Sequence, residues 1–398
     1  MRIRALASLV AIALVAVLAG CSPDADRRLA EGAAEQLGDS AFYTPPTTVP
    51  TGRPGDIERQ EQILSAPSGS RAWRLIYHSI DAFGRDVLVS GIVVAPAAAP
   101  VGGKRTIVSW AHPTTGSAPR CAPSVGVDPF STIEGLKDLL ARGYTVAATD
   151  YPGMGLTGPS SYLIGSSAAH SVLDIARAAE TIPAAHAGDR VLLWGHSQGG
   201  QAVVFAAEEA AQYAPDLKIV AAAVAAPAID LVTLLDDDIG TISGVTIGSY
   251  AFTAYAGAYG VPLESILTPA AAAAVPGMAK LCLLGQNAQL HTIGKPLVGS
   301  FLRSDPGTTP PWDTLLAENT PGSVRLDIPL FVAQGETDTL VHPAATAAFV
   351  ARECALGTRV RALSIPDTGH GLVALKALSE LLPWFSAAVE GRTPDSTC

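Results

Sequence analysis

The pattern of hydrophobic and polar positions predicts short strands alternating with helices along most of the chain. Residues 71–96 alternate apolar and polar side chains on both sides of the turn "DAFGRD", which predicts an antiparallel hairpin. Further apolar runs, each bounded by turn residues, predict buried strands at 105–112, 144–150, 190–196, 218–227, 328–335 and 359–366. Helical periods fill the segments between these runs. A hairpin followed by such alternation predicts an α/β fold, a mostly parallel sheet with helices on both faces.

The alternation is interrupted once, between about residues 228 and 327. The middle of this segment, "YAFTAYAGAYGVPLESILTP", is rich in alanine, leucine and aromatic residues. We interpret it as a helical cap inserted above the carboxyl edge of the sheet, and we call it the cap below. The acidic string "LLDDDIG" at 234–240 is interpreted as an exposed hinge into the cap. The whole folded domain is expected to span 42–398.

The N-terminus has the pattern of an export signal. Arg2 and Arg4 precede an uncharged apolar stretch at 5–19, which is shorter than the about twenty residues of a membrane-spanning helix. A signal peptide at 1–20 is therefore favoured over a retained membrane anchor. The sequence "LAGC" at 18–21 resembles a bacterial lipobox, which implies cleavage before Cys21 and acylation of its thiol. We expect an exported protein, either anchored to a membrane through lipid on Cys21 or secreted, with residues 21–41 as a tether.

The net charge of the chain limits the classes of binding partner. The chain carries 26 Lys and Arg against 36 Asp and Glu, a net charge of −10, and loss of Arg2 and Arg4 with the signal peptide makes it −12. This acidic balance argues against nucleic acid as a partner and against charge-driven binding to anionic lipid.

An even number of cysteines after Cys21 predicts two disulfides, with three possible pairings. These cysteines are Cys121, Cys282, Cys354 and Cys398.

No residue spacing predicts a metal site. No two cysteines stand at CxxC spacing, and five histidines at positions without ligand spacing are interpreted as structural or solvated. These are His78, His170, His186, His291 and His342.

A first glycine motif, G-x-G-x-x-G at Gly153, Gly155 and Gly158, follows a predicted strand. A dinucleotide site needs its helix to begin immediately and an acidic residue at the end of the next strand. Here "GPSSYLIGS" delays the helix, and Asp174 falls inside it. We therefore interpret these glycines as a sharp turn over the sheet edge and expect no nucleotide cofactor.

A second glycine motif, "WGHSQGG", has the form G-x-S-x-G, with Ser197 between Gly195 and Gly199. A predicted strand leads into it and a helical period leads out. That strand-turn-helix context is typical of a nucleophile elbow, in which a strained turn exposes the serine hydroxyl above the sheet. Ser197 is therefore the predicted nucleophile.

A serine hydroxyl needs a base to take its proton and a carboxylate to orient that base. In this fold the partners follow in the order acid, then histidine. Asp338 lies just beyond one predicted strand and His370 just beyond the next. Glu336 is the competing acid, and Asp367 is interpreted as a turn former or helix cap.

The oxyanion hole is expected to combine the backbone N–H of Gln198 with one from the loop "AHPTTG", at Thr114 or Thr115. His112 stands where related hydrolases carry the histidine of an H-G motif, and we expect it to hold this loop. Pro113 replaces the glycine of that motif, so the motif does not decide between the two threonines.

Over about 42–398 the chain resembles the secretory lipase family of α/β-hydrolases. The matching segments are "FYTPP", "RPGDIERQE", "HPTTGSAPRCAPS", "ATDYPGMG", "GHSQGG", "PPWDTLLAENTPG" and the late Asp338 and His370. The resemblance implies hydrolysis of triacylglycerol or other esters, a lid in the cap, and the disulfides Cys121–Cys282 and Cys354–Cys398. The chain departs from the family in its lipobox, since members are usually freely secreted, and in its oxyanion loop.

The sequence thus predicts a serine hydrolase that cleaves carboxylic esters through an acyl-enzyme, with a lipid or other ester as substrate and no metal or cofactor. The apolar cap favours an acyl chain, hence a lipase. The alternatives are a short-chain carboxylesterase, an acyltransferase or peptidase with the same triad, and a non-catalytic surface binding protein.

Overall fold

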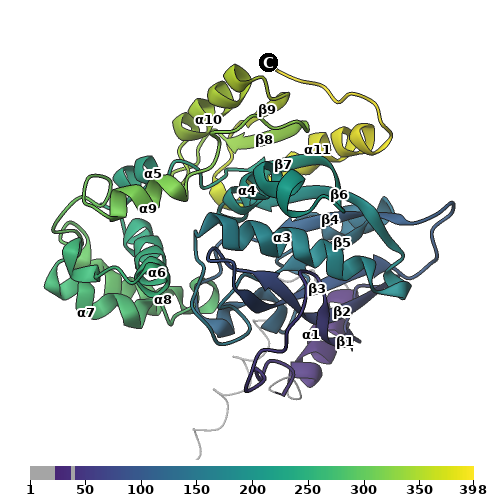
Figure 1. The fold of residues 1–398 in the computed structure, drawn as a ribbon, viewed down its shortest axis with the longest axis horizontal. Coiled ribbons are helices and arrows are strands. Elements are labelled where there is room, and N and C mark those ends of the chain that lie inside the picture. The colour runs from purple at the N-terminus through teal and green to yellow at the C-terminus, as the bar shows by residue number, and fades with distance from the viewer. Residues whose placement is uncertain (1–22, 37–40) are drawn as a thin grey trace, which may run out of the picture.

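The computed structural model describes residues 23–36 and 41–398 of the chain (Figure 1). The predicted signal peptide at 1–20 and the predicted lipidation site, Cys21, lie outside the described residues.

In the described part of the chain, nine strands form one sheet in the order β1-β2-β3-β5-β4-β6-β7-β8-β9. The pairs β1–β2, β2–β3 and β3–β5 are antiparallel, and all the others are parallel. The strands are β1 (Ile57–Ile63), β2 (Ser70–Ile80), β3 (Asp86–Pro96), β4 (Arg105–Ala111), β5 (Thr145–Thr149), β6 (Ala187–His196), β7 (Lys218–Ala225), β8 (Leu330–Gly335) and β9 (Val360–Ile365).

The predicted hairpin is β2 and β3, whose register runs from Ser70 opposite Pro96 to Ile80 opposite Asp86. Strand β1 was not expected, because its sequence "IERQEQI" is mostly polar, and most of its residues are indeed half-buried or exposed. Strand β5 is buried at every residue, as parallel strands covered on both faces are. The predicted α/β fold class is confirmed.

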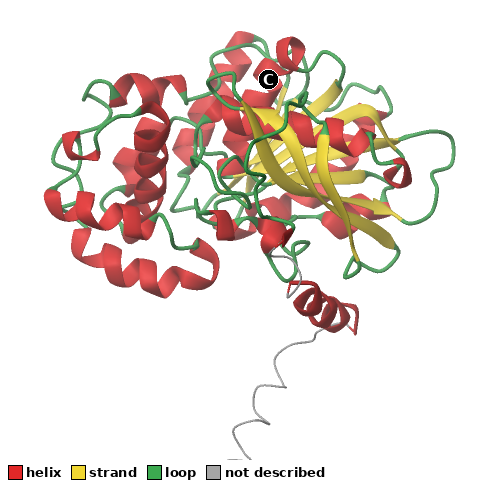
Figure 2. Cartoon of the chain, turned by 60° about the horizontal axis from the view of Figure 1, so that its bottom comes forward, coloured by secondary structure: helices red, strands yellow, loops and turns green. Residues whose placement is uncertain are grey.

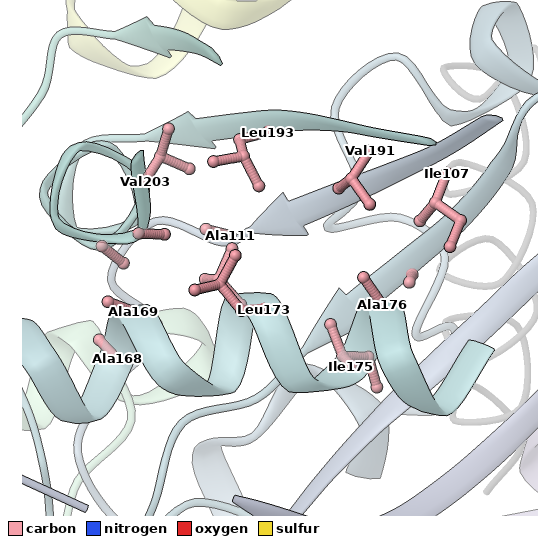
Figure 3. Packing of buried hydrophobic residues seen from close by; sticks show 14 of the residues in the cluster. Ile107, Ala111, Ala168, Ala169, Leu173, Ile175, Ala176, Val191, Leu193 and Val203 are labelled. Atoms are coloured by element: carbon pink, nitrogen blue, oxygen red, sulfur yellow. The ribbon is translucent and has the colours of Figure 1, made fainter. Parts of the chain in front are cut away.

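Helices cover both faces of the sheet (Figure 1). One face packs against α3 (Gly165–Glu180), α4 (Gln198–Tyr213) and α10 (Pro343–Leu356). The other packs against α2 (Leu136–Ala141) and α11 (Val373–Val389). Figure 3 shows Leu173 and the small side chains of Ala169 and Ala176 of α3 directed toward β4 and β6. Burial of a leucine such as Leu173 contributes about 1.5–3 kcal/mol.

One stretch of the described chain, His370–Val389, has the length and hydropathy of a membrane span. Half of it is buried inside the protein, and α11 packs its apolar side onto the sheet through Leu381 and Phe385. We therefore assign it to the core of the domain.

Between β7 and β8 the cap forms a helical lobe beside the sheet (Figure 2). It has an apolar core of its own, which includes Phe252, Phe301 and Trp312. Its helices are α5 (Leu231–Asp238), α6 (Ile242–Tyr259), α7 (Pro269–Met278), α8 (Leu283–Gly294) and α9 (Trp312–Glu318).

The segment expected to be a tether differs from that expectation. Residues Pro23–Gln36 form a helix, α1. Ion pairs from Asp24 to Arg27 and Arg28, three and four residues apart, stabilise it from within. Arg27 also donates to the carbonyl oxygen of Ala66, and Glu35 accepts from Ser65. Charge pairing within the helix, rather than an apolar stripe, accounts for its formation.

Candidate active site

Ser197 lies in a strained turn between β6 and α4. Strand β6 ends at His196 and α4 begins at Gln198, so the turn is a single residue with φ 56° and ψ −117°. A positive φ is unfavourable for a residue with a side chain. The N–H of Ser197 bonds to the carbonyl oxygen of Ala225 at 2.9 Å, which holds the turn above the parallel sheet.

The two flanking glycines are required by close backbone contacts. A Cβ atom on Gly195 would lie 2.2 Å from the carbonyl oxygen of Gly199, and a Cβ atom on Gly199 would lie 1.9 Å from that of Ala111. Neither contact can be relieved by rotating a side chain, because both obstacles are backbone atoms. The turn therefore needs glycine at both positions.

Asp338 and His370 reach Ser197 from the loops that follow β8 and β9. The Nε2 atom of His370 lies 2.9 Å from the Oγ atom of Ser197, and its Nδ1 atom lies 2.8 Å from Oδ2 of Asp338. Because a carboxylate only accepts, Nδ1 carries the proton and Nε2 is left to accept from the serine hydroxyl. The three predicted residues thus form one hydrogen-bonded series.

Asp338 is held as a carboxylate. It is buried, and its Oδ1 atom accepts from the backbone N–H groups of Leu340 and Val341, both at 2.9 Å. Burial raises the pKa of Asp338, but the hydrogen bond from His370, the positive charge that its ring carries when protonated, and the two N–H groups outweigh it, so the net pKa is lowered.

The two competing acids lie elsewhere. Glu336 accepts from the hydroxyl of Ser364 at 2.9 Å, in an exposed position at the end of β8. Asp367 adopts a left-handed φ of 48°, and its carbonyl oxygen accepts from Lys376. These contacts place Asp367 in a turn and leave Asp338 as the acid that contacts His370.

The structure distinguishes between the predicted oxyanion donors. Gln198 and Thr114 line the same pocket as Ser197. Within the described residues, neither of their N–H groups has a backbone acceptor. Thr115 is buried away from the pocket, where its hydroxyl donates to the carbonyl oxygen of Cys121 at 2.8 Å. Thr114 is therefore the better placed of the two threonines.

This loop is fastened to the cap. Cys121 and Cys282 form a disulfide with a Cα–Cα distance of 5.2 Å. Beside it, the N–H of Leu283 donates to the carbonyl oxygen of Thr115 at 2.9 Å, and the hydroxyl of Ser117 donates to that of Ala279 at 3.1 Å. The second disulfide joins Cys354 to Cys398. Both pairings are those that the family resemblance implies.

His112 stands at the start of the same loop. Its Nδ1 atom donates to the carbonyl oxygen of Pro113 at 2.6 Å, and its own carbonyl oxygen accepts from the hydroxyl of Tyr151. Burial lowers the pKa of His112 more strongly than the nearby charge of Asp150 raises it. A neutral imidazole fixed to its own loop fits the expected structural role.

The first glycine motif forms a turn. Gly153 and Gly155 have φ angles of 84° and 71°, and a Cβ atom on Gly155 would lie 2.0 Å from Oγ of Ser90. The following helix, α3, begins only at Gly165. A phosphate group at the motif would therefore not meet the N-terminus of that helix.

The histidines without ligand spacing have individual contacts. His78 bonds to Asp86, His170 to the carbonyl oxygen of Ile80, and His342 lies 3.8 Å from Asp237. Within the described residues, no three His, Cys, Asp or Glu side chains come together as a metal-binding group.

A mainly apolar pocket opens beside Ser197, between the sheet edge and the cap. It has a cavity volume of about 90 Å³, within a wider space of about 740 Å³ that includes open solvent. Among its apolar lining residues are Leu231, Leu234, Leu235, Ile239, Ile247, Ala251, Phe252 and Leu316. Such a surface suits a hydrocarbon group.

The pocket also contains a carboxyl group that the sequence did not indicate. The acidic string expected to be an exposed hinge ends in Asp238, the last residue of α5, which is 7% exposed and lines the pocket. Burial, chiefly, together with the charges of Asp237 and Asp338, raises the pKa of Asp238 to about 6, although His342 lowers it. Only Asp236 and Asp237 are exposed as expected, because helical geometry turns Asp238 to the opposite side.

Replacing Asp238 by asparagine is expected to raise the melting temperature at pH 8 by more than at pH 4. The pKa of the carboxyl is higher in the folded state than in the unfolded state, so the folded state binds the proton more tightly. Stability is then greatest below the unfolded pKa and falls as the pH rises through about 6. Thermal unfolding of both proteins at both pH values measures this effect. An equal gain at pH 4 and pH 8 would contradict it.

One further residue near the triad was missed. The ring of His196, next to Ser197, lies 4.9 Å from the ring of His370, and its Nδ1 atom bonds to Glu134 at 2.9 Å. Its position inside the G-x-S-x-G motif was the available signal. The partner, Glu134, lies 62 residues away in the sequence and could not be found from local pattern.

Comparison with known proteins finds lipases among the proteins similar to this chain. The profile of the family described as "Secretory lipase" matches residues 130–281. "Lipase 10" of Candida albicans is 30% identical over 224 residues, which cover 51% of this chain and 46% of that protein. A "probable inactive lipase" of Mycobacterium tuberculosis is 31% identical over 214 residues, which cover 48% of this chain and 46% of that protein.

Among solved structures, Candida antarctica lipase A in its closed state is similar, with a TM-score of 0.75 at 19% identity. That likeness covers 91% of this chain and 88% of the other, and it supports the fold. The alignments with the two curated relatives span about half the length of each.

Proposed function

We propose that this chain, which belongs to the secretory lipase family of α/β-hydrolases, hydrolyses carboxylic esters, with lipid acyl esters as the preferred class. One relative is named a probable inactive lipase, so family membership does not carry the proposal alone. The observation that carries it is the continuous series of hydrogen bonds from Ser197 through His370 to Asp338.

The mechanism follows from the protons that these bonds hold. His370 takes the hydroxyl proton of Ser197 through Nε2 while Oγ attacks the ester carbonyl carbon. Asp338 stabilises the imidazolium that forms. The lowered pKa of Asp338 keeps it ionised during this step. His370 then gives the proton to the leaving alcohol, and water releases the acid from the acyl-enzyme by the same route.

The N–H groups of Gln198 and Thr114 are the proposed oxyanion donors. Both residues line the pocket beside Ser197. Backbone donors that are fixed in advance stabilise the developing negative charge on the ester oxygen without reorganising during the reaction. The disulfide Cys121–Cys282 and the hydrogen bond beside it connect the loop that carries Thr114 to the cap, and so hold the N–H of Thr114 in position.

The apolar pocket supports an acyl chain as the buried part of the substrate. Each methylene group transferred from water into such a surface contributes about 0.8 kcal/mol. Chain length should therefore affect turnover until the pocket is filled. An export route, with a lipid anchor at Cys21, remains part of the proposal, and the two disulfides are consistent with an oxidising compartment.

The experiment is hydrolysis of p-nitrophenyl esters with acyl chains of two to sixteen carbons by the domain from residue 42 onward. We expect kcat/KM to increase with chain length and to peak at long chains. A peak at the shortest esters would instead indicate a short-chain carboxylesterase. Amide cleavage, or transfer of the acyl group to an added alcohol in preference to water, would indicate a peptidase or an acyltransferase. Absence of turnover with every ester would overturn the proposal.

A further inference from the structure

The carboxyl group of Asp238 faces the pocket without a protein partner. It lines the pocket that contains Ser197, and 93% of the residue is buried, since 7% is exposed. Within the described chain, no N–H or O–H group donates to either of its carboxylate oxygens. Only its backbone carbonyl oxygen is engaged, by Thr241. Its carboxylate oxygens are not among the fully shielded, unpartnered side-chain atoms, so they open onto the pocket, and burial of the residue removes part of their hydration at a cost in free energy.

A second unpartnered oxygen belongs to another residue that lines the pocket. The Oε1 atom of Gln198 is buried and has no hydrogen-bond partner among the described residues. Gln198 lines the pocket as a residue, but this oxygen is shielded from it. The carboxyl group of Asp238, on α5 of the cap, is therefore the unpartnered acceptor that the pocket reaches.

Local structure does not explain Asp238. It is the last residue of α5, where a negative charge faces the negative end of the helix dipole. The neighbouring charges of Asp237 and Asp338 are also negative, and His342, whose charge when protonated would oppose them, lies 3.8 Å from Asp237. The charge of Asp238 destabilises the end of its own helix, and its burial costs free energy. A ligand group that binds to this carboxylate explains its position better.

The hydroxyl groups of the tyrosines and the threonine that line the pocket are already engaged. The hydroxyl of Tyr162 bonds to that of Thr114, and the hydroxyl of Tyr255 donates to the carbonyl oxygen of Leu163. Apart from the N–H groups of Gln198 and Thr114, which are assigned to the oxyanion at the Ser197 end, no described group donates to Asp238, and the rest of the wall is mainly hydrocarbon. A hydroxyl supplies one donor on an apolar frame. An ammonium group would bring three donors and a charge that this wall would leave unsolvated.

Building on the proposed ester hydrolysis, we propose that Asp238 is a specificity-determining residue that selects esters whose buried, mainly apolar portion carries a hydroxyl group. The hydroxyl donates to the carboxylate of Asp238. A plain hydrocarbon chain fits the walls but leaves the carboxylate dry and unpartnered. The preferred substrates are therefore hydroxylated acyl esters.

The test compares p-nitrophenyl octanoate with its 3-, 6- and 8-hydroxy derivatives. The readout is the ratio of kcat/KM for the hydroxylated ester to that for the plain ester, which cancels effects on the triad. Wild type is expected to prefer one hydroxylated ester. Asp238→Leu is expected to lower that ratio about tenfold or more, because a hydrogen bond to a charged group is lost. Asp236→Asn, which removes a charge from the exposed side of the same helix, is expected to leave the ratio unchanged.

A second variant tests whether misfolding of the leucine variant explains its lower ratio. Asp238→Asn keeps the shape of the side chain and one acceptor oxygen, so its ratio is expected to lie between those of wild type and the leucine variant. An unchanged ratio in both variants would overturn the proposal, and so would a wild-type preference for the plain ester over all three derivatives. A stronger preference for the 8-ammonio ester would overturn the hydroxyl assignment. If the wild type hydrolyses no ester at all, the proposed ester hydrolysis itself is overturned.

Discussion

Replacing Ser197 by alanine is expected to lower kcat for p-nitrophenyl esters about 10⁴-fold or more. The hydroxyl is the atom that His370 contacts at 2.9 Å, and no other side-chain oxygen receives that contact among the described residues. Alanine adopts the strained turn no less readily than serine and removes only the hydroxyl. The variant should therefore fold and bind substrate while turnover is lost, as steady-state kinetics would show.

The control for this experiment is Ser379→Ala, an exposed serine on α11 whose removal should not change turnover. Adding His370→Ala to the Ser197 variant is expected to cause little further loss, because residues that act as a unit give non-additive effects. Activity close to wild type in Ser197→Ala would place the nucleophile elsewhere and contradict the proposed mechanism.

Replacing Asp338 by asparagine is expected to lower kcat about 10⁴-fold. The amide of asparagine can donate to Nδ1 of His370, which would put the proton on Nε2 and leave no acceptor for the hydroxyl of Ser197. The N–H groups of Leu340 and Val341 would still bond to the remaining oxygen, so the loop should keep its shape. Kinetics together with thermal unfolding would separate the two effects.

Glu336→Gln is the matched comparison, since it changes the same functional group two residues away. Glu336 contacts Ser364 in an exposed position, so this variant is expected to retain wild-type kcat. The reverse result, with loss in Glu336→Gln and none in Asp338→Asn, would exchange the roles of the two acids.

The sequence was most informative where function depends on local geometry. A strand, a turn flanked by Gly195 and Gly199, and a helix lie within one short segment, so Ser197 could be recognised from its neighbours. Asp338 and His370 could be placed because parallel strands end at one edge of the sheet, and residues after successive strands meet there. The structure brings all three within hydrogen-bonding distance.

The misses depend on contacts between distant segments. Thr114 and Thr115 are adjacent and alike, and only the fold of the loop around Cys121 decides which one faces the pocket. Burial of Asp238 depends on how α5 packs over the sheet edge. Helix α1 was not predicted because its sequence shows no strong apolar period, and charge pairs such as Asp24 with Arg28 contribute to its stability.

The disulfide between Cys121 and Cys282 restricts how the cap can move. A body joined to another at two points can rotate about the line through them, and the cap has two such points where the chain leaves β7 and enters β8. A third attachment away from that line removes the rotation, and the disulfide is such an attachment, reinforced by the Leu283–Thr115 hydrogen bond. The oxidised cap therefore cannot swing away from the sheet as a rigid unit. Widening of the pocket has to come from bending within the cap, and reduction of this one bond would restore the missing degree of freedom.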